Sequence, residues 1–279
     1  MIRLFHASDL HFGCEDRAAL DWFAACVERE KPDALAITGD LTMRARQREF
    51  DAAGEWIAAL KAPATVEVGN HDLPYFNPLE RFTRPYHRIR RIERLVEREI
   101  ELQGLAIVPL KTTARAQWRL DWSKGAVGDK ALAKTMDALA NMPSDGSRVT
   151  LVTAHHPLEE AGTRGQALTK GGKRALAALA GAGVTAVLSG HVHDAFDLMR
   201  ETANGPIRMI GAGTLSQRIR STPPSFNELR IVDGRVEVRV RTFGESPPTE
   251  DMQIPDVPED SQVRPGEPIA PRAAPSTTS

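Results

Sequence analysis

The sequence has little cysteine and no long apolar run. Only two of its 279 residues are cysteine, Cys14 and Cys26, and neither has a CxxC partner. Such sparse cysteine argues against a disulfide framework and against a zinc site built from thiolates. The opening MIRLFHASD has too short an apolar run for a signal peptide, and no window approaches the roughly 20 apolar residues of a membrane span. We therefore expect a cytoplasmic protein without a membrane-spanning segment.

An excess of charge of one sign is also missing. The chain has 36 Lys and Arg against 37 Asp and Glu, which gives a formal net charge of -1. No global basic field points to bulk nucleic-acid binding, so any binding of anions has to be local. The hydrophobic share of 41% and the charged share of 26% exclude collagen-like and wholly disordered chains and fit an ordinary globular protein.

Short β-rich runs alternate with runs of helical period from residue 2 to about 190, which is typical of a layered α/β sandwich. The expected strands cover residues 2–7, 34–38, 64–68, 149–153 and 185–188, and the expected helices cover 18–30, 46–60 and 173–180. Beyond Asp194, four strands follow without helices between them, over 196–201, 207–210, 227–232 and 236–243, with a hairpin turn at Asp233-Gly234. We expect these four to form a second, partly antiparallel sheet packed against the first.

We expect one domain over residues 1–243 and a Pro-rich tail over 244–279. Eight of the 19 prolines fall in the last 34 residues, which contain no aromatic side chain, so we expect the tail to be disordered. Within the domain, residues from about 73 to 100 are rich in arginine, including Arg81. This stretch is either a solvated helix face or an inserted cap that contacts a phosphate, a nucleotide or a second copy of the chain, because arginine presents a bidentate fork to anions.

Metal-ligand residue types recur where five of the expected strands end. In parallel α/β sheets the carboxyl ends of strands face a common crevice, so residues far apart in sequence converge there. Carboxylates, neutral imidazoles and an amide suit manganese, iron or zinc better than calcium, and the lack of cysteine ligands favours an open hydrolytic site. The five segments are Asp9-Leu10-His11, Gly39-Asp40, Gly69-Asn70-His71-Asp72, Thr153-Ala154-His155-His156-Pro157 and Ser189-Gly190-His191-Val192-His193.

Two of these segments have ligands two residues apart, Asp9-x-His11 and His191-x-His193. In extended backbone such residues project to the same side of the chain. We therefore expect each segment to supply both of its ligands to one metal ion or to two neighbouring ones.

These five motifs, in this order and with these separations, resemble the calcineurin-like metallophosphoesterase family, and the signature covers residues 9–193. The chain is similar in particular to the bacterial branch that includes class III cyclic nucleotide phosphodiesterases. The resemblance implies a four-layer α/β/β/α sandwich with two mixed central sheets and two divalent metal ions, Mn, Fe or Zn. In the family pattern the ligand stands two residues before the proline, which favours His155 over His156. The implied ligands are Asp9, His11 and His193 for one metal, Asn70, His155 and His191 for the other, and Asp40 between them.

The resemblance also implies two catalytic residues, Asp40 and His71. Two neighbouring cations can bind both oxygens of an in-line displacement at phosphorus, and a carboxylate between them offsets their repulsion. His71 would lie outside the ligand shell and would steady or protonate the reacting phosphate, since an imidazole titrates near working pH. The expected substrate contacts are His71, Asn70 and Arg81.

The leading hypothesis is a phosphoesterase that hydrolyses a phosphodiester by attack of a metal-bound hydroxide. The most concrete substrates are a 3′,5′-cyclic nucleotide and a glycerophosphodiester. The alternatives are a lipid pyrophosphate or phospholipid hydrolase at a membrane surface, a nuclease, and a non-catalytic scaffold. The near-neutral charge weighs against the nuclease, and the presence of every expected ligand weighs against the scaffold. The sequence leaves a homodimer, the natural substrate and the metal identity open.

Overall fold

The computed structural model describes residues 1–74, 77–90, 92, 100, 102–114, 123–142, 148–166 and 169–245. The tail predicted over 244–279 lies outside the described residues from 246 onward, and so does much of the arginine-rich stretch, including 91 and 93–99. Both interpretations therefore stay predictions. Among the described residues, none of the helices has the length and apolar character needed to cross a membrane.

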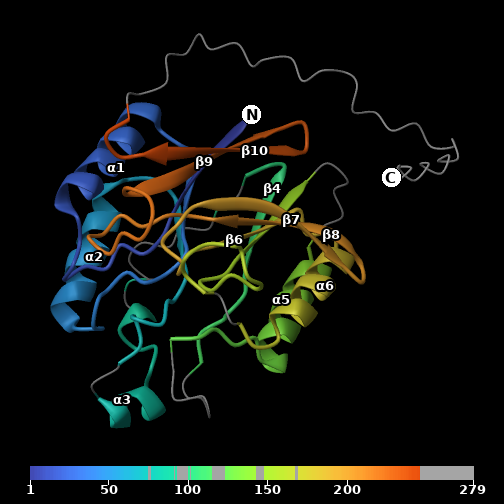
Figure 1. The fold of residues 1–279 in the computed structure, drawn as a ribbon, viewed down its shortest axis with the longest axis horizontal. Helices are drawn as coiled ribbons and strands as arrows, with labels where there is room; N and C mark the ends of the chain where they lie inside the picture. The colour runs from blue at the N-terminus through green and yellow to red at the C-terminus, as the bar shows by residue number, and fades with distance from the viewer. Residues whose placement is uncertain are drawn as a thin grey trace, which may run out of the picture. The chain divides into compact units, whose positions relative to one another are not determined.

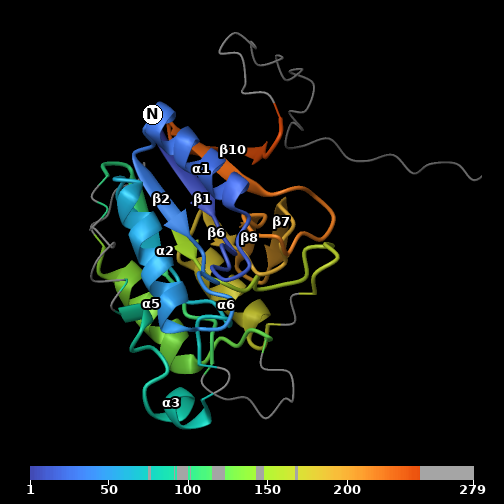
Figure 2. The same cartoon turned by 90° about the vertical axis from the view of Figure 1, so that its left-hand side faces the viewer.

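The first sheet has a parallel half and an antiparallel half that meet at its central strand, β1. Two helices, α1 (Arg17–Glu30) and α2 (Gln47–Ala59), cover one of its faces, as Figure 2 shows. The first of them begins where the Asp16 side chain accepts the N–H of Ala19, which satisfies a free donor at the helix start. In sheet order the strands are β10 (Arg235–Thr242), β9 (Ser225–Val232), β1 (Ile2–Ala7), β2 (Ala34–Ile37) and β3 (Ala64–Val66).

The second sheet is parallel except for one edge strand, β7, which runs antiparallel to β8. The helices α5 (Asp129–Ala140) and α6 (Gly172–Gly181) lie side by side against it (Figure 1). A short helix, α3 (Pro78–Thr83), precedes this part of the chain. In sheet order the strands are β4 (Leu105–Pro109), β5 (Val149–Thr153), β6 (Ala186–Ser189), β8 (Gly205–Gly211) and β7 (Phe196–Thr202).

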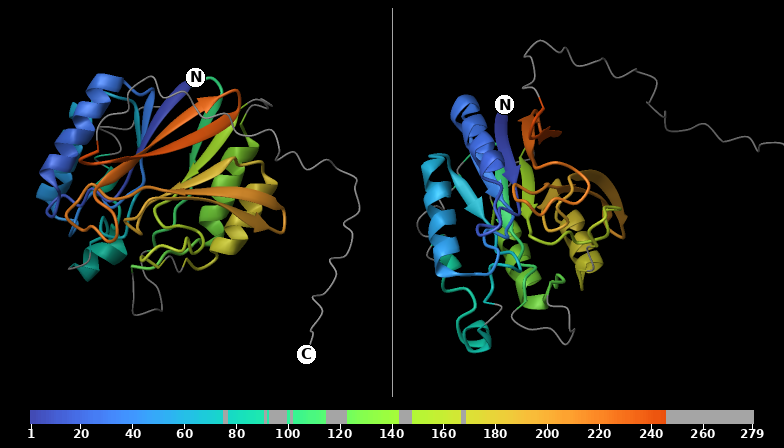
Figure 3. Two further views of the ribbon diagram at one scale, coloured as in Figure 1. Left: turned by 45° about the horizontal axis from the view of Figure 1, so that its top comes forward. Right: turned by 60° about the vertical axis from the view of Figure 1, so that its left-hand side comes forward.

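Three apolar cores hold these elements in four layers. Successive side chains of a strand point to opposite faces of its sheet, so Phe5 of β1 packs with Phe23 of α1 whereas Leu4 packs between the two sheets with Leu151 of β5. A third core, which includes Leu176, joins the second sheet to its helices. Figure 3 shows the resulting order of helices, sheet, sheet and helices. The predicted four-layer α/β/β/α sandwich with two mixed sheets is confirmed.

One part of the predicted topology is wrong. The four C-terminal strands do not form a sheet of their own, because β7 and β8 extend the second sheet whereas β9 and β10 extend the first. Alternation of apolar residues indicates which face of a strand is buried, but it does not identify the neighbouring strand. The second sheet also contains β4, at its other edge. Neither β4 nor α5 was predicted from the sequence.

Candidate metal centre

The residues predicted as metal ligands sit in loops that follow parallel strands of both sheets. The loops after β1, β2 and β3 meet the loops after β5 and β6, and hydrogen bonds join them. The main-chain N–H of His191, for example, donates to Oδ2 of Asp9 at 2.8 Å. Residues from all five loops are thereby brought together: Asp9, His11, Asp40, Asn70, His71, His155, His191 and His193.

The expectation that the Asp-x-His and His-x-His segments are extended is wrong. Five of the predicted ligands have left-handed backbone, a conformation that costs a non-glycine residue roughly 1–3 kcal/mol. Tight turns, rather than extended chain, therefore direct these side chains inward, and backbone strain of this kind is typical of functional sites. The φ angles are 55° at Asp9, 46° at His11, 51° at Asp40, 69° at His191 and 63° at His193.

Glycines in the motifs allow the loops to come this close. A Cβ atom added to Gly69 would lie 2.0 Å from Oδ1 of Asp40, and one added to Gly190 would lie 2.6 Å from Oδ2 of Asp9. Neither position has room for a side chain. The glycines of the sequence motifs thus position the two carboxylates rather than bind anything themselves.

Asp9, His11 and His193 form the first group of side chains. Nε2 of His193 lies 3.1 Å from Oδ1 of Asp9, and Nε2 of His11 lies 3.6 Å from the same oxygen. The two Nε2 atoms are 3.3 Å apart. All three side chains are buried, and they are the three that the resemblance assigns to the first metal.

Asp40 lies between this group and a second one. Its Oδ2 atom is 3.7 Å from Nε2 of His11 and 3.4 Å from Nε2 of His155. Nε2 of His155 is in turn 3.2 Å from Oδ1 of Asn70. The other oxygen of Asp40 accepts the main-chain N–H of His71 at 2.8 Å. One carboxylate therefore faces both groups, as a bridging ligand must.

His191 and His156 both lie beside the second group, but their surroundings differ. The ring centroid of His191 is 5.2 Å from that of His155 and 4.5 Å from that of His156. Both ring nitrogens of His156 already have protein partners, the Thr112 hydroxyl at 2.9 Å and the Ser123 carbonyl at 2.9 Å. These contacts favour His155 over His156 as a ligand.

Three of the histidines predicted as ligands share one orientation. Their Nδ1 atoms lie near main-chain carbonyl oxygens, at 3.4 Å from Thr42 for His11, 2.7 Å from Thr38 for His155 and 2.5 Å from Arg218 for His193. A carbonyl only accepts, so each Nδ1 carries a proton, and in the neutral ring the lone pair is then on Nε2, which faces the cluster. This is the tautomer that binds a metal through Nε2.

Burial and mutual attraction set the charges of the cluster. Burial by itself would raise the pKa of Asp40, but the neighbouring imidazoles, His155 first among them, hold that pKa well below its usual range. Burial opposes a charge on His155, yet the Asp40 carboxylate raises the pKa of His155 to about 9. Burial, reinforced by His155, lowers the pKa of His191 to about 3. The Asp40 carboxylate thus stays ionised, as a metal ligand requires.

The donor set fits divalent cations. Oδ1 of Asp9 lies within 3.6 Å of Nε2 of both His11 and His193, and the two Nε2 atoms are 3.3 Å apart. A divalent cation among these three atoms would take a lone pair from each of them. Buried imidazoles and carboxylates without thiolates suit manganese, iron or zinc, so the residues present match the pair of ions that the sequence motifs imply.

Asp72 holds two of the ligand-bearing loops together from behind. Its buried carboxylate accepts the main-chain N–H groups of Leu41, Thr42 and Gly69 at 3.2, 2.9 and 2.9 Å. Burial and the nearby Asp40 carboxylate raise the pKa of Asp72 to about 6. The last residue of the Gly-Asn-His-Asp motif is therefore a positioning residue.

A cavity of about 350 Å³ adjoins the cluster. Its size falls within the range of small-molecule sites. The predicted site residues that line it are Asp40, Asn70, His71, His191 and His193. Four cationic side chains also line it, and none of them is among the predicted site residues: Lys124, Arg164, Arg218 and Arg220. The signal that could have found two of them is the Arg218-Ile219-Arg220 repeat in the segment after β8, another parallel strand.

Arg218 reaches the predicted catalytic histidine. Its Nη1 atom lies 2.9 Å from Nε2 of His71 and 3.3 Å from Nε2 of His11. A guanidinium only donates hydrogen bonds, so Nε2 of His71 accepts and the proton of that ring is on Nδ1. Nδ1 of His71 lies 2.8 Å from the Met43 carbonyl, which accepts this proton.

Arg81, a predicted substrate contact, is placed elsewhere. It lies on α3 with its side chain buried, and its Nη2 atom is 3.4 Å from the carbonyl oxygen of Ala114. Arg81 is not among the residues that line the 350 Å³ cavity. The structure therefore does not bring Arg81 together with the other predicted site residues.

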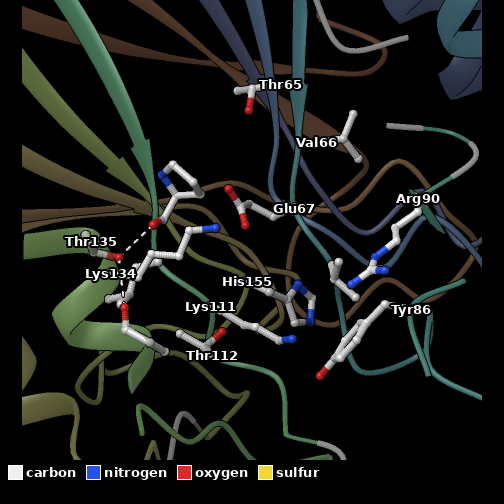
Figure 4. Close-up of a pocket in the computed structure, with 14 residues that line it drawn as sticks. Thr65, Val66, Glu67, Tyr86, Arg90, Lys111, Thr112, Lys134, Thr135 and His155 are labelled. Atoms are coloured by element: carbon white, nitrogen blue, oxygen red, sulfur yellow. Dashed lines mark hydrogen bonds between the residues drawn. The ribbon is translucent and has the colours of Figure 1, made fainter. Parts of the chain in front are cut away.

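A second cavity, of about 410 Å³, lies between β3 of one sheet and β4 of the other. Figure 4 shows its polar lining, in which Glu67, Lys111 and Lys134 surround the central space and His155 contributes one wall. Glu67 accepts the Thr153 hydroxyl at 2.6 Å. His155 is the only predicted ligand among the described residues that line this second cavity, so the first cavity is the one that exposes the cluster.

Comparison with known proteins places this geometry in context. The family model described as calcineurin-like phosphoesterase matches residues 2–195. A probable cyclic nucleotide phosphodiesterase of Synechococcus sp. is 28% identical over 201 residues, which are 68% of this chain and 72% of that protein. The glycerophosphodiester phosphodiesterase GpdQ of Enterobacter lignolyticus is 32% identical over 92 residues, which are 27% of this chain and 33% of that protein.

Solved structures share the fold. A dimetal phosphatase from Danio rerio superposes with a TM-score of 0.61 at 13% identity, over 87% of this chain and 99% of that one. At this identity the likeness concerns the arrangement of the sheets and helices alone.

Proposed function

The chain belongs to the calcineurin-like phosphoesterase family, and on this premise we propose that its substrate is a phosphodiester, either a 3′,5′-cyclic nucleotide or a glycerophosphodiester. The family match and the phosphodiesterase relatives make the protein a metal-dependent phosphoester hydrolase. The choice of a diester rests on the relatives, which are described as phosphodiesterases.

The observation that carries the proposal is the position of Asp40 between two groups of imidazoles beside an open cavity. When bound, two divalent cations supply positive charge that stabilises the reacting phosphoryl group and favours ionisation of water. The residues that would hold one ion are Asp9, His11 and His193, those that would hold the other are Asn70, His155 and His191, and Asp40 would contact both.

A cationic side chain of the protein would also act on the phosphoryl group. In hydrolysis a water oxygen bonds to phosphorus, the ester P–O bond breaks, and one proton of the water passes to the leaving alkoxide. Charge grows on the phosphoryl oxygens, and a guanidinium held beside them stabilises it. Arg218 is in position to do this, since it reaches His71 and His11 at the cluster.

His71 orients Arg218 rather than donating a proton in this arrangement. Its Nδ1 proton is held by the Met43 carbonyl and its Nε2 accepts from Arg218. Of the two roles expected for His71, protonating the leaving group does not fit these contacts, and steadying the phosphate fits them through Arg218. Asn70 would contact the substrate from the same loop.

Hydrolysis of bis(p-nitrophenyl) phosphate tests the proposed function. We expect activity with added Mn²⁺, loss of activity after chelation, and recovery when Mn²⁺ is restored. Comparison of cyclic nucleotides, glycerophosphodiesters, lipid pyrophosphates and single-stranded DNA in the same preparation then separates a phosphodiesterase of small molecules from a lipid hydrolase or a nuclease. Absence of hydrolysis of every substrate at full metal occupancy would favour the non-catalytic scaffold.

The cytoplasmic location, the contact with a membrane surface and the homodimer are predictions of the sequence that stay predictions. Sedimentation and vesicle co-flotation of the full chain are the measurements that address the last two.

A further inference from the structure

The wall of the 350 Å³ cavity is more cationic than a single phosphodiester requires. A phosphodiester carries one negative charge, and the metal ions that the cluster suits would already offset it. Arg164, Arg218 and Arg220 nevertheless face the same cavity, and the only carboxylate of the described lining is the predicted ligand Asp40. None of the described lining residues is Phe, Tyr or Trp, so this part of the wall has no such ring on which a base could stack.

Arg164 and Arg220 differ from Arg218 in having no side-chain partner within the part of the chain that the structure describes. Among the described residues, neither makes a side-chain hydrogen bond or an ion pair, in contrast to Arg218, which is held by His71. Both side chains are exposed. A guanidinium offers a bidentate fork that matches the oxygens of a phosphate group, and two of them match the double charge of a phosphate monoester.

The segment that carries Arg220 is fixed to the metal centre. The main-chain carbonyl of Arg218 accepts Nδ1–H of His193 at 2.5 Å. Three residues further on, the N–H of Ser221 donates to Oδ1 of Asp194 at 3.1 Å and its hydroxyl donates to Oδ2 at 3.2 Å. Arg220 therefore extends from a backbone that is bonded on both sides to the turn of His193 and Asp194.

The loop that carries Arg164 rests on the same turn. A Cβ atom added to Gly165 would lie 2.8 Å from the carbonyl oxygen of Val192, so the loop backbone packs directly on the residue between His191 and His193. The Thr163 hydroxyl donates to the Gly165 carbonyl at 2.8 Å and closes the loop at this point. Arg164 and Arg220 thus lie on two separate segments that both contact the turn of residues 191–194.

We propose that Arg164 and Arg220 bind a second phosphate group of the substrate, so that the enzyme acts on phosphodiesters that also carry a phosphate monoester. This inference rests on the proposed function, because it places the diester itself at the metal cluster beside Arg218. The pre-positioned loops reduce the ordering cost of binding, and the second phosphate gives selectivity over diesters that lack it.

A pair of substrates that differ only in the second phosphate tests the proposal. Thymidine 5′-(p-nitrophenyl phosphate) and its 3′-phosphorylated derivative have the same diester and the same leaving group. With the Mn²⁺-loaded protein we expect the 3′-phosphate to raise kcat/KM by about tenfold or more, mainly through KM, as two charge-assisted contacts allow. In the Arg164→Gln, Arg220→Gln double variant this ratio should fall to about threefold or less, whereas the Arg239→Gln control on β10 should keep it.

Binding without turnover gives a second readout. Calorimetry with metal-free protein should show tighter binding of thymidine 3′,5′-bisphosphate than of thymidine 5′-monophosphate, and the double variant should lose the difference. Equal kcat/KM for the two substrates in the wild type, or a ratio retained by the double variant, would overturn the proposal. If the substrate pair shows no difference, hydrolysis of bis(p-nitrophenyl) phosphate by the same preparation identifies which proposal has failed. Absence of this hydrolysis means that the proposed function has failed. Presence of it means that only the second phosphate site has failed.

Discussion

Nη1 of Arg218 lies 2.9 Å from Nε2 of His71, and this contact links the segment after β8 to the loop after β3. The two residues follow strands of different sheets and are 147 positions apart in the chain. In this contact Nε2 of His71 accepts a hydrogen bond from Arg218. It also places a permanent positive charge at the edge of the metal cluster, where the phosphoryl group of a substrate would lie.

Replacement of Arg218 by alanine should therefore lower kcat/KM by about 10²–10³, the usual cost of losing one donor that stabilises developing charge. Metal content should stay the same, because His193 is held by the main-chain carbonyl of residue 218, which alanine keeps. Elemental analysis and steady-state kinetics on bis(p-nitrophenyl) phosphate measure the two effects. Arg239→Gln is the control for loss of a surface charge. A rate within twofold of the wild type would contradict the assignment.

Replacement of Asp40 by alanine should remove metal and activity together. The carboxylate is the side chain that faces both imidazole groups, at 3.7 Å from His11 and 3.4 Å from His155. Without it, two cations at close range repel each other with no anion between them. Metal content after dialysis and turnover with Mn²⁺ measure the outcome, and Asp40→Asn keeps the shape as a control. Full activity of the alanine variant would exclude the bridging role.

Much of the fold could be predicted because local patterns determine it. The helix over 18–30 and the strand over 149–153 were expected from apolar periodicity, and the structure has them at Arg17–Glu30 and Val149–Thr153. The partners of the C-terminal strands could not be predicted in this way. β9 joins β1 across more than 200 residues, and the alternation within a strand carries no information on such a long-range choice.

The convergence of the Asp, Asn and His side chains of the site could be predicted because each of them sits in a recognisable motif beside a strand end. The arginines of the cavity are harder to select, because the chain has many arginines and a short Arg218-Ile219-Arg220 repeat is a weak signal beside the five motifs. Arg81 illustrates the difficulty: it was selected from an arginine-rich stretch, whereas Arg218, which lies outside that stretch, is the one that contacts His71.

Replacement of Asp72 by alanine should destabilise the fold. The change leaves the buried N–H groups of Leu41, Thr42 and Gly69 without their acceptor, and each unsatisfied donor costs about 1–3 kcal/mol. We expect the free energy of unfolding to fall by about 3–5 kcal/mol in urea denaturation of the metal-free protein. Asp72→Asn keeps one acceptor oxygen and should lose less. A loss below about 1 kcal/mol for the alanine variant would show that Asp72 does not hold the loops.

Replacement of Gly69 by alanine tests whether close loop contact positions Asp40. The added Cβ would lie 2.0 Å from Oδ1 of Asp40 and 2.2 Å from its main-chain nitrogen, so the bridging carboxylate has to move. We expect a fall in the free energy of unfolding of about 1–3 kcal/mol, together with reduced metal content and activity. Gly128→Ala is the control, because nothing lies within 4 Å of its added Cβ. This change is expected to cost some stability, because Gly128 is the N-cap of α5, but it should leave metal content and activity unchanged. Normal metal content in the Gly69 variant would contradict this expectation. It would show that Asp40 tolerates displacement and that close contact between the two loops is not needed for metal binding.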